Sequence, residues 1–474
     1  AFNAGLDMDM IDTCYADHLA ELIVEGKVSM HDIDASVERI LRMKFELGLF
    51  ETPFTKEVAE SARVLKPEYK ALAAKIAEES MVLLKNKASY ENDNENNSAN
   101  SVNSCKNKSK GLLPLCGQRL ALIGPMVKDR HEIIGSWRCF GEDKDAQTLY
   151  EGMVEEFGEN NLLYAKGCNL MYSAEQESRV AEGKHAMRDN RSTAEMEAEA
   201  LQIARQADII ILAMGEASGM SGEASCFVNI EMPDAQRDLM RKIVALGKKT
   251  ILLHVAGRPT VMNWENEHIP AILETWFLGS EGADAMADVL FGEYAPSGRL
   301  TTSFPRHVGQ LPLGYRQMST GRPVEGDDFD EYGSCYIDVA NTPLYPFGYG
   351  LSYTSFDYTS PVLSDSVMGQ NDTVYVSVKV TNTGKRTGKE TVQLYIKDVV
   401  ATSARPIEEL RGFTQVTLEA GETQEVQFAI HKDVLAYYNA ANVWTLEPGL
   451  FRIMVAHDSR EALRQEHGIR LNVQ

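Results

Sequence analysis

The chain lacks the patterns typical of metal, redox or nucleic-acid proteins. Its seven cysteines include no Cys-x-x-Cys pair, and its ten histidines show no zinc-type spacing. We therefore expect mostly free thiols, no metal and no cofactor. With 47 basic against 69 acidic residues, the formal net charge is -22, which would repel nucleic acid phosphates and anionic lipid. We expect no nucleic acid and no membrane as partner, and a neutral small molecule fits better.

Long apolar runs are also lacking. None approaches the roughly eighteen residues that a membrane helix needs, and no stretch has the pattern of a signal peptide. The chain begins at Ala1 without a methionine, in sequence typical of a domain interior. We therefore expect further sequence upstream, in which case the absence of a targeting signal is uninformative. The length of 474 residues predicts two or three domains.

The first part of the chain, residues 1–50, is predicted to form two helices. The first covers residues 17–25, and the second begins at Ser29, with Asp32 three positions later as a variant of the capping box. An apolar stripe follows the second helix and consists of Ile33, Val37, Ile40, Leu41 and Leu47. Because fifty residues cannot bury such a stripe, we expect it to pack on something outside this segment.

Between this part and the next domain, the composition changes twice. Residues 51–70 are polar and contain Pro53 and Pro67, which is typical of a linker. Residues 71–84 are predicted to form a helix with an apolar face. Residues 88–110 consist largely of Asn, Ser, Lys and Glu, so we expect a disordered insertion.

Residues 71–318 are predicted to form an α/β sandwich domain with a mostly parallel sheet and helices on both faces. The clearest helices are 194–206, preceded by Ser192, and 234–246. Several expected strands end in a glycine turn, but none completes a dinucleotide or phosphate-loop pattern. The apolar runs expected to be strands are 120–123, 161–165, 208–214, 250–256 and 271–277.

The last part of the chain, residues 319–474, has a connecting segment followed by a two-residue alternation of apolar and polar side chains. Residues 319–350 are rich in Gly, Pro, Asp and Tyr and are interpreted as a connecting segment. From 351 to 474 apolar and polar residues alternate, which predicts a small antiparallel β-sandwich. The clearest alternations lie at 374–380, 392–396, 426–430 and 451–455.

The stretch from Ala207 to Ser225 is the candidate site. An apolar run there is followed by a loop with three glycines in eight residues, which suits close approach to another group. Ligands of open α/β sheets bind beyond the carboxyl ends of the strands. Glu216 and Glu223 are its proton-transfer candidates, and we favour Glu223. We expect Glu216 to accept loop amide hydrogen bonds, and a solvated carboxylate is the alternative for Glu223.

Short motifs follow one another along the whole chain: Gly5–Met10, Leu47–Phe50, Gly215-Glu216 with Glu223, Gly257-Arg258-Pro259, Leu290–Gly292, Pro296–Leu300 and Tyr345–Thr354. In this order they resemble glycoside hydrolase family three, in particular its bacterial periplasmic β-glucosidases. The resemblance implies a TIM barrel, an α/β sandwich and a fibronectin type III-like domain in succession. It makes residues 1–50 the C-terminal remnant of the barrel and 351–474 the fibronectin type III-like domain.

The same resemblance implies roles for two residues. Glu223 matches the acid/base glutamate, which the second domain carries on a loop over the barrel mouth. Trp137, in Gly135-Ser136-Trp137, matches a tryptophan that stacks on the sugar, and a place in the core is the alternative. The nucleophilic aspartate of the family lies upstream of the segment matching Gly5–Met10, so none of the aspartates present is assigned that role.

The implied activity is that of a retaining exo-β-glycosidase. A β-glucosidase acting on terminal non-reducing β-D-glucosyl residues is the leading interpretation, and β-xylosidase is the rival enzyme. A non-catalytic carbohydrate-binding or scaffold fragment is the other alternative. The implied partners are a β-glucoside or oligosaccharide substrate and the missing N-terminal barrel, and a homodimer stays open. We expect a periplasmic or secreted protein, with a cytoplasmic one as the alternative, and expect the chain alone to be inactive.

Overall fold

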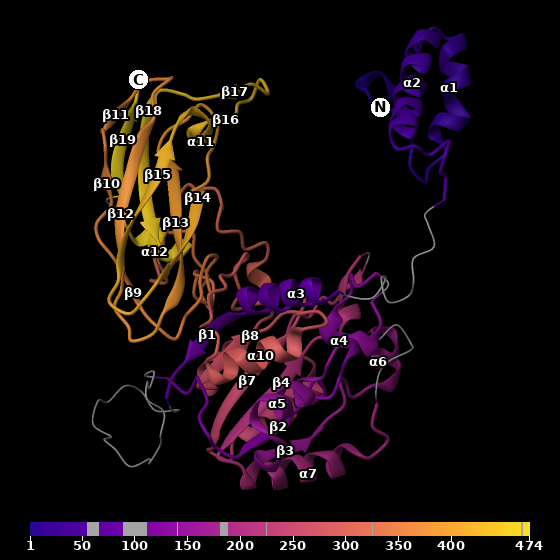
Figure 1. The fold of residues 1–474 in the computed structure, drawn as a ribbon. Helices are drawn as coiled ribbons and strands as arrows, with labels where there is room; N and C mark the ends of the chain where they lie inside the picture. Colours follow the sequence, from indigo (N-terminus) through magenta and orange to yellow (C-terminus); the bar gives the residue numbers. More distant parts are fainter. Residues whose placement is uncertain are drawn as a thin grey trace. The chain divides into compact units, whose positions relative to one another are not determined.

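The computed structural model describes residues 1–54, 66–88, 111–139, 141–180, 188–223, 225–324, 326–465 and 468–474. Except for residue 88, the predicted disordered insertion lies outside these ranges. The chain divides into two compact units, Ala1–Pro67 and Glu68–Gln474 (Figure 1). The second unit holds both the α/β part and the β-sandwich. The domain boundaries within it stay predictions.

The first unit consists of a short turn, η1 (Phe2–Ala4), and two helices, α1 (Cys14–Val24) and α2 (Met30–Glu46). The predicted cap is present, since the Ser29 hydroxyl accepts the amide of Asp32 at 3.1 Å. Val28 is the one buried apolar side chain among residues 1–54. Val37 and Leu41 of the predicted stripe, together with Phe45, line an open hollow on α2. Val37, Leu41 and Leu47 of the stripe are exposed, and Ile33 and Ile40 are half-buried.

The second unit is built on a six-stranded sheet with the order β1-β8-β7-β4-β2-β3. All neighbours are parallel except β1 and β8 at one edge. Every residue of β4 is buried, as expected for a strand covered on both faces. The mostly parallel sheet is confirmed. Its strands are β1 (Val82–Asn86), β2 (Leu120–Ile123), β3 (Leu162–Ala165), β4 (Ile209–Gly215), β7 (Lys249–Val255) and β8 (Ala271–Glu274).

One expectation in this region is wrong. The helix predicted over residues 71–84 is α3 (Pro67–Ser80), and the apolar residues after it form strand β1 instead. Periodicity cannot separate a short buried strand from a buried helical turn, and pairing with β8 decides the outcome. Because α3 begins at Pro67, a position that suits a first helical residue, the last residues of the predicted linker are helical.

Helices cover both faces of the sheet (Figure 1), as predicted. Helices α3, α5 and α10 pack on one face, and α7, α8 and α9 on the other. Ser192 and Glu195 form a capping box at the start of α7, since each accepts the backbone amide of the other. No described helix has the length and apolar character needed to cross a membrane. The helices are α4 (His131–Ile134), α5 (Leu149–Phe157), α6 (Ala174–Val180), α7 (Thr193–Gln206), α8 (Asp234–Val244), α9 (Asn263–His268) and α10 (Gly282–Phe291).

The C-terminal part is a sandwich of two largely antiparallel sheets (Figure 1), which confirms the predicted architecture. One sheet contains β10 (Val362–Leu363), β12 (Val374–Asn382) and β15 (Thr423–Ile430), with β9 (Phe356–Tyr358) also paired to β12. The other sheet has the order β11 (Val367–Met368), β19 (Ile469–Val473), β18 (Gly449–Ala456), β13 (Gly388–Asp398) and β14 (Glu409–Leu418). Short elements complete it: α11 (Lys432–Leu435), β16 (Tyr437–Tyr438), β17 (Trp444–Thr445) and α12 (Ser459–Arg464).

Strand β13 departs from the expected alternation because it is buried on both faces. Residues of the connecting segment cover its outer face. The Gln393 side-chain amide donates to the Gly348 carbonyl at 3.0 Å, and the Phe347 ring stacks on Tyr315 at 4.0 Å between centroids. The sandwich therefore packs directly on the polypeptide that follows the α/β part.

A buried polar cluster lies at this contact. The Glu390 carboxylate, 1% exposed, accepts hydrogen bonds from the Arg299 guanidinium at 2.7 Å and from the Tyr358 hydroxyl at 2.8 Å. Its third partner is His457 Nδ1 at 3.0 Å. Burial alone would raise the pKa of Glu390, but the His457 hydrogen bond and the Arg299 charge hold it below the usual range. Burial likewise opposes the charge on His457, but Glu390 outweighs it and raises the pKa of that imidazole.

These two shifts predict how the contact responds to pH. The His457 contribution is complete below the unfolded value of about 6.5 and is lost as the pH rises through the raised folded pKa. The difference in free energy of unfolding between the wild type and His457→Gln should therefore shrink as the pH rises above about 6.5. Urea denaturation at each pH measures it. A gap that stays constant or widens would contradict the assignment.

Candidate active site

Glu223 lies at the tip of a short β-hairpin. Strands β5 (Ser221–Gly222) and β6 (Ser225–Cys226) pair antiparallel, which leaves Glu223 in a two-residue connection. The hairpin follows β4 through a single turn, η5 (Ser218–Met220). The Glu223 side chain is exposed. The carboxyl is thus presented to the outside of the domain instead of being buried in its core.

The hairpin lies at the point where the sheet reverses its order. From β2 the chain adds β3 on one side, and then β4, β7 and β8 on the other. The carboxyl ends of β2 and β4 therefore flank the switch point, where open α/β sheets bind their ligands. The segment after β2 contains Trp137, and the segment after β4 contains Glu223. Topology brings the two predicted site residues to the same edge.

Trp137 is 71% exposed. A core position, the alternative from the sequence, is not what the structure shows. Its neighbour Ser136 approaches the hairpin, since a Cβ at Gly222 would lie 3.8 Å from the Ser136 Cβ. An aromatic face and a carboxyl are thus both available on this surface.

Glu216 has a different partner from the one expected. Its carboxylate is 2% exposed and accepts from the Arg258 guanidinium, with 2.8 Å between Nη2 and Oε1 and 3.1 Å between Nε and Oε1. Within the part of the loop that the structure describes, no amide donates to this carboxylate, and the Arg258 cation makes several hydrogen bonds with it instead. The Arg258 Nη1 also donates to the Phe227 carbonyl at 3.0 Å. One guanidinium therefore contacts the chain both before and after the hairpin.

Two glycines allow these elements to meet closely. Gly215 has a φ of 153°, and a Cβ there would come within 1.8 Å of the Val255 carbonyl oxygen at the end of β7. A Cβ at Gly257 would come within 2.7 Å of the Ser221 hydroxyl. A side chain at position 215 would push the ends of β4 and β7 apart, and one at position 257 would press on the Ser221 side chain of the hairpin.

Sequence reasoning missed a second buried carboxyl at this edge. Glu132, on α4, is 4% exposed, and its Oε2 accepts the Ser218 amide at 2.5 Å. Burial, reinforced by the charge of Asp129, raises the pKa of Glu132 to about 7, and the Ser218 hydrogen bonds and Arg138 oppose the rise. The two partners are 86 positions apart, so no local pattern in the sequence connects them.

A third buried carboxyl, that of Glu274, is paired with His254. His254 Nδ1 lies 2.5 Å from Glu274 Oε2, and both side chains are fully buried. Burial raises the pKa of Glu274. In His254 burial acts in the opposite direction, but the adjacent Glu274 outweighs it and raises the pKa of the imidazole. Since neither group reaches the surface, this pair is unsuited to proton transfer with an external substrate.

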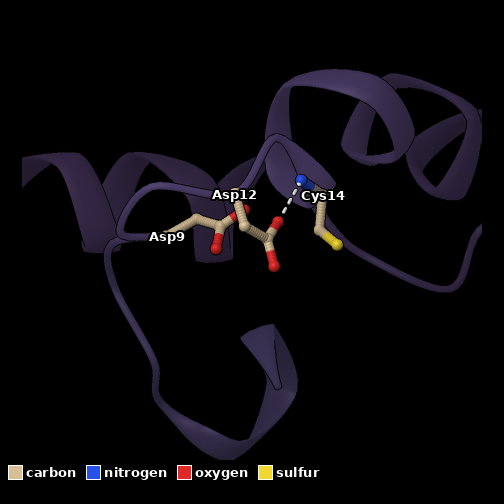
Figure 2. A group of neighbouring side chains, drawn as sticks. All are labelled: Asp9, Asp12 and Cys14. Carbon is tan, nitrogen blue, oxygen red and sulfur yellow. Dashed lines mark hydrogen bonds between the residues drawn. The ribbon is translucent and has the colours of Figure 1, made fainter. Parts of the chain in front are cut away.

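Outside this edge, one group has the spacing of metal ligands among the described residues: Asp9, Asp12 and Cys14, whose ligand atoms lie within 4.8 Å of one another (Figure 2). Asp12 accepts the Cys14 amide at 2.8 Å, and Asp9 accepts the Tyr15 amide at 3.1 Å. Free amides at a helix start need such acceptors, so capping of α1 accounts for the cluster.

Cys14, Cys139, Cys168, Cys226 and Cys335 are free, whereas Cys116 is disulfide-bonded.

Comparison with known proteins agrees with this architecture. Residues 81–353 match the glycosyl hydrolase family 3 C-terminal domain, and residues 390–459 match the fibronectin type III-like domain. A periplasmic β-glucosidase of Salmonella typhimurium is 38% identical over 97% of this chain and 58% of its own length. A β-xylosidase of Formosa agariphila is 34% identical over 96% of this chain and 59% of its own.

A solved structure gives the same result. The β-glucosidase from Listeria innocua in complex with isofagomine has a TM-score of 0.82 and 32% identity, covering 100% of this chain and 60% of that protein. The chain thus spans about three fifths of the length of its relatives. Since the family domain alone covers more than half of its residues, the chain belongs to glycosyl hydrolase family 3.

Proposed function

We propose that the protein to which this chain belongs is a retaining exo-β-glucosidase with Glu223 as its acid/base. It would hydrolyse terminal non-reducing β-D-glucosyl residues by double displacement. The observation that carries this proposal is the placement of an exposed carboxyl on a hairpin at the switch point of the sheet. The named activity of the Salmonella typhimurium and Listeria innocua relatives supports it.

Double displacement needs a second carboxyl about 5 to 5.5 Å from the first. We propose that this nucleophile is an aspartate in sequence upstream of residue 1, within the rest of the TIM barrel. The nucleophile attacks the anomeric carbon while Glu223 protonates the departing oxygen. Glu223 then takes a proton from water, which attacks the glycosyl-enzyme and releases the sugar with its configuration retained.

An acid must hold its proton until the leaving group needs it, which requires partial desolvation or a neighbouring negative charge. Glu223 is exposed at the hairpin tip. In this proposal the barrel supplies both when it faces the hairpin. The exposed apolar side chains of α2, among them Val37, Leu41 and Phe45, support the idea that residues 1–50 pack on further barrel polypeptide.

The substrate and compartment are the finer parts of the proposal. The β-xylosidase from Formosa agariphila keeps β-xylosidase as the rival activity, and a panel of aryl β-glucosides and β-xylosides separates the two. The Salmonella typhimurium relative is named as periplasmic, and we propose the same compartment here. A non-catalytic carbohydrate-binding fragment remains the alternative from another class.

The first prediction concerns the 474 residues alone. Without the proposed nucleophile they should show no measurable hydrolysis of aryl β-glucosides, whereas the product of the complete gene should hydrolyse them. Release of nitrophenol from matched concentrations of the two proteins measures this. Turnover by the shorter chain would show that its own residues supply both carboxyls.

The second prediction concerns Glu223→Gln in the complete enzyme. Loss of the proton donor should lower kcat/KM by roughly 10²- to 10⁴-fold for aryl glucosides with poor leaving groups and much less for activated ones. Azide should partly restore the rate on activated substrates. Glu267→Gln, an exposed carboxyl on α9, is the matched control. Equal rates in the Glu223 variant and the wild type would rule out the assignment.

The third prediction concerns Trp137. Replacement by alanine removes a ring that stacks on the sugar, so KM should rise about 10-fold while Trp137→Phe, which keeps a ring, retains most of the affinity. Initial rates over a range of substrate concentrations separate KM from kcat. An unchanged KM in Trp137→Ala would place the ring outside the sugar site.

A further inference from the structure

We infer that Glu132 is a positioning residue for the hairpin that carries Glu223, acting through its hydrogen bond with the Ser218 amide. The inference rests on the role proposed for Glu223. Glu132 is remote in sequence from the hairpin, but its carboxyl meets the turn that opens it. Glu132 has no place in the chemistry itself, because its carboxyl is buried and directed to a backbone amide.

The position of Glu132 is well defined. It lies in the short helix α4, whose first amides, those of His131 and Glu132, both donate to the Asp129 carboxylate at 2.8 Å. The helix ends at Ile134, and its C-cap, Gly135, lies two residues before Trp137. Glu132 and Ser218 are each 4% exposed. A hydrogen bond between two enclosed groups is protected from competition by water.

The hydrogen bond from the Ser218 amide to Glu132 holds a part of the loop 216–227, which contains the hairpin, that the Arg258 guanidinium does not contact. Arg258, which follows β7, contacts Glu216 and Phe227 at the two ends of the hairpin. Glu132, which follows β2, holds the turn η5 between them. The hairpin is therefore fixed from both sides of the switch point. Because Glu132 lies in α4 and Trp137 follows shortly after that helix, the same contact also joins the loop that carries Glu223 to the segment that carries Trp137.

Simple satisfaction of a buried amide does not explain the choice of a glutamate. A neutral acceptor would satisfy the Ser218 amide without the cost of enclosing an ionisable group. The charged groups that face this carboxyl are Asp129 and Arg138, with His131 and Lys166 facing Asp129. A carboxylate accepts a stronger hydrogen bond than a neutral acceptor. We therefore infer that the stronger hydrogen bond of the Glu132 carboxylate, which attaches the hairpin more firmly, offsets the free-energy cost of burying an ionisable group.

Because burial raises the pKa of Glu132, its contribution to stability and the strength of its hydrogen bond both depend on pH. With a pKa near 7, Glu132 is a neutral acid below that pH and a carboxylate above it. The folded state favours the neutral form, so the stability that Glu132 contributes is complete below its unfolded value of about 4.5 and falls as the pH rises to about 7. The Ser218 hydrogen bond itself is strongest in the ionised form. Glu132→Gln has neither dependence.

Amide hydrogen exchange in this chain tests the attachment without requiring catalysis. In Glu132→Ala the amides of residues 216–223 should exchange about 10-fold faster, while those of β4 and β13 stay unchanged. Glu132→Gln keeps an oxygen acceptor and should remain within about 3-fold of the wild type. After correction for intrinsic exchange rates, exchange of the hairpin amides should slow as the pH rises through about 7 in the wild type, because Glu132 then ionises and its hydrogen bond with the Ser218 amide strengthens. Glu132→Gln should show no such change. Unchanged hairpin exchange in Glu132→Ala would overturn the inference.

Kinetics of the complete enzyme then test positioning. Glu132→Ala should lower kcat about 10-fold for substrates with poor leaving groups, which need the Glu223 proton, with little change in KM or on activated substrates. Glu132→Gln should restore most of the rate. Equal losses on both substrate classes would indicate a merely structural role. Failure of the Glu223→Gln prediction would reject the proposed function and leave the exchange result standing.

A second variant covers the case in which Glu132→Ala does not fold. Ser218→Pro removes the donor and leaves the carboxyl in place. Ser218 is the first residue of η5 and follows Ala217 at φ -71° and ψ 154°, which suits a proline. It should accelerate exchange in the rest of the hairpin and lower kcat for poor leaving groups as Glu132→Ala would. Wild-type values for both would equally overturn the inference.

Discussion

The ion pair between Glu216 and Arg258 is the interaction on which the candidate site depends. It joins the ends of two neighbouring parallel strands, β4 and β7, and one guanidinium serves both ends of the hairpin. Removing the cation would leave a buried carboxylate uncompensated, at a cost of about 3–5 kcal/mol. The glycines at 215 and 257 allow the two turns to approach closely enough for this pair to form.

Those features that depend on neighbouring residues could be predicted from the sequence. Strand β4 is an unbroken apolar run, and the caps at Ser29 and Ser192 each need a partner only three positions away. The site loop followed from the same reasoning, since a buried strand that changes abruptly into glycine-rich sequence must leave the sheet there. The place of Glu223 on a hairpin tip is one step further, because the pairing of β5 with β6 is not visible in composition.

The features that escaped prediction depend on distant partners. Residues 82–86 became a strand because β8 was available at the sheet edge, and β13 lost its exposed face because the connecting segment covers it. The partners of Glu216 and Glu132 come from other strand ends. In each case the sequence shows a group that must be satisfied, and only the fold decides which group satisfies it.

In this site the residues that hold the hairpin are buried, and the residues proposed to meet the substrate are exposed. Groups that hold the hairpin, Glu216, Arg258 and Glu132, are enclosed or largely so, whereas Glu223 and Trp137 are exposed. A carboxyl that must enter a sugar pocket formed by other polypeptide has to project from its own domain, and projection would cost orientation if its base were loose. Enclosed charge at the base resolves this conflict, because the low local dielectric that makes burial costly also makes each paired contact stiff.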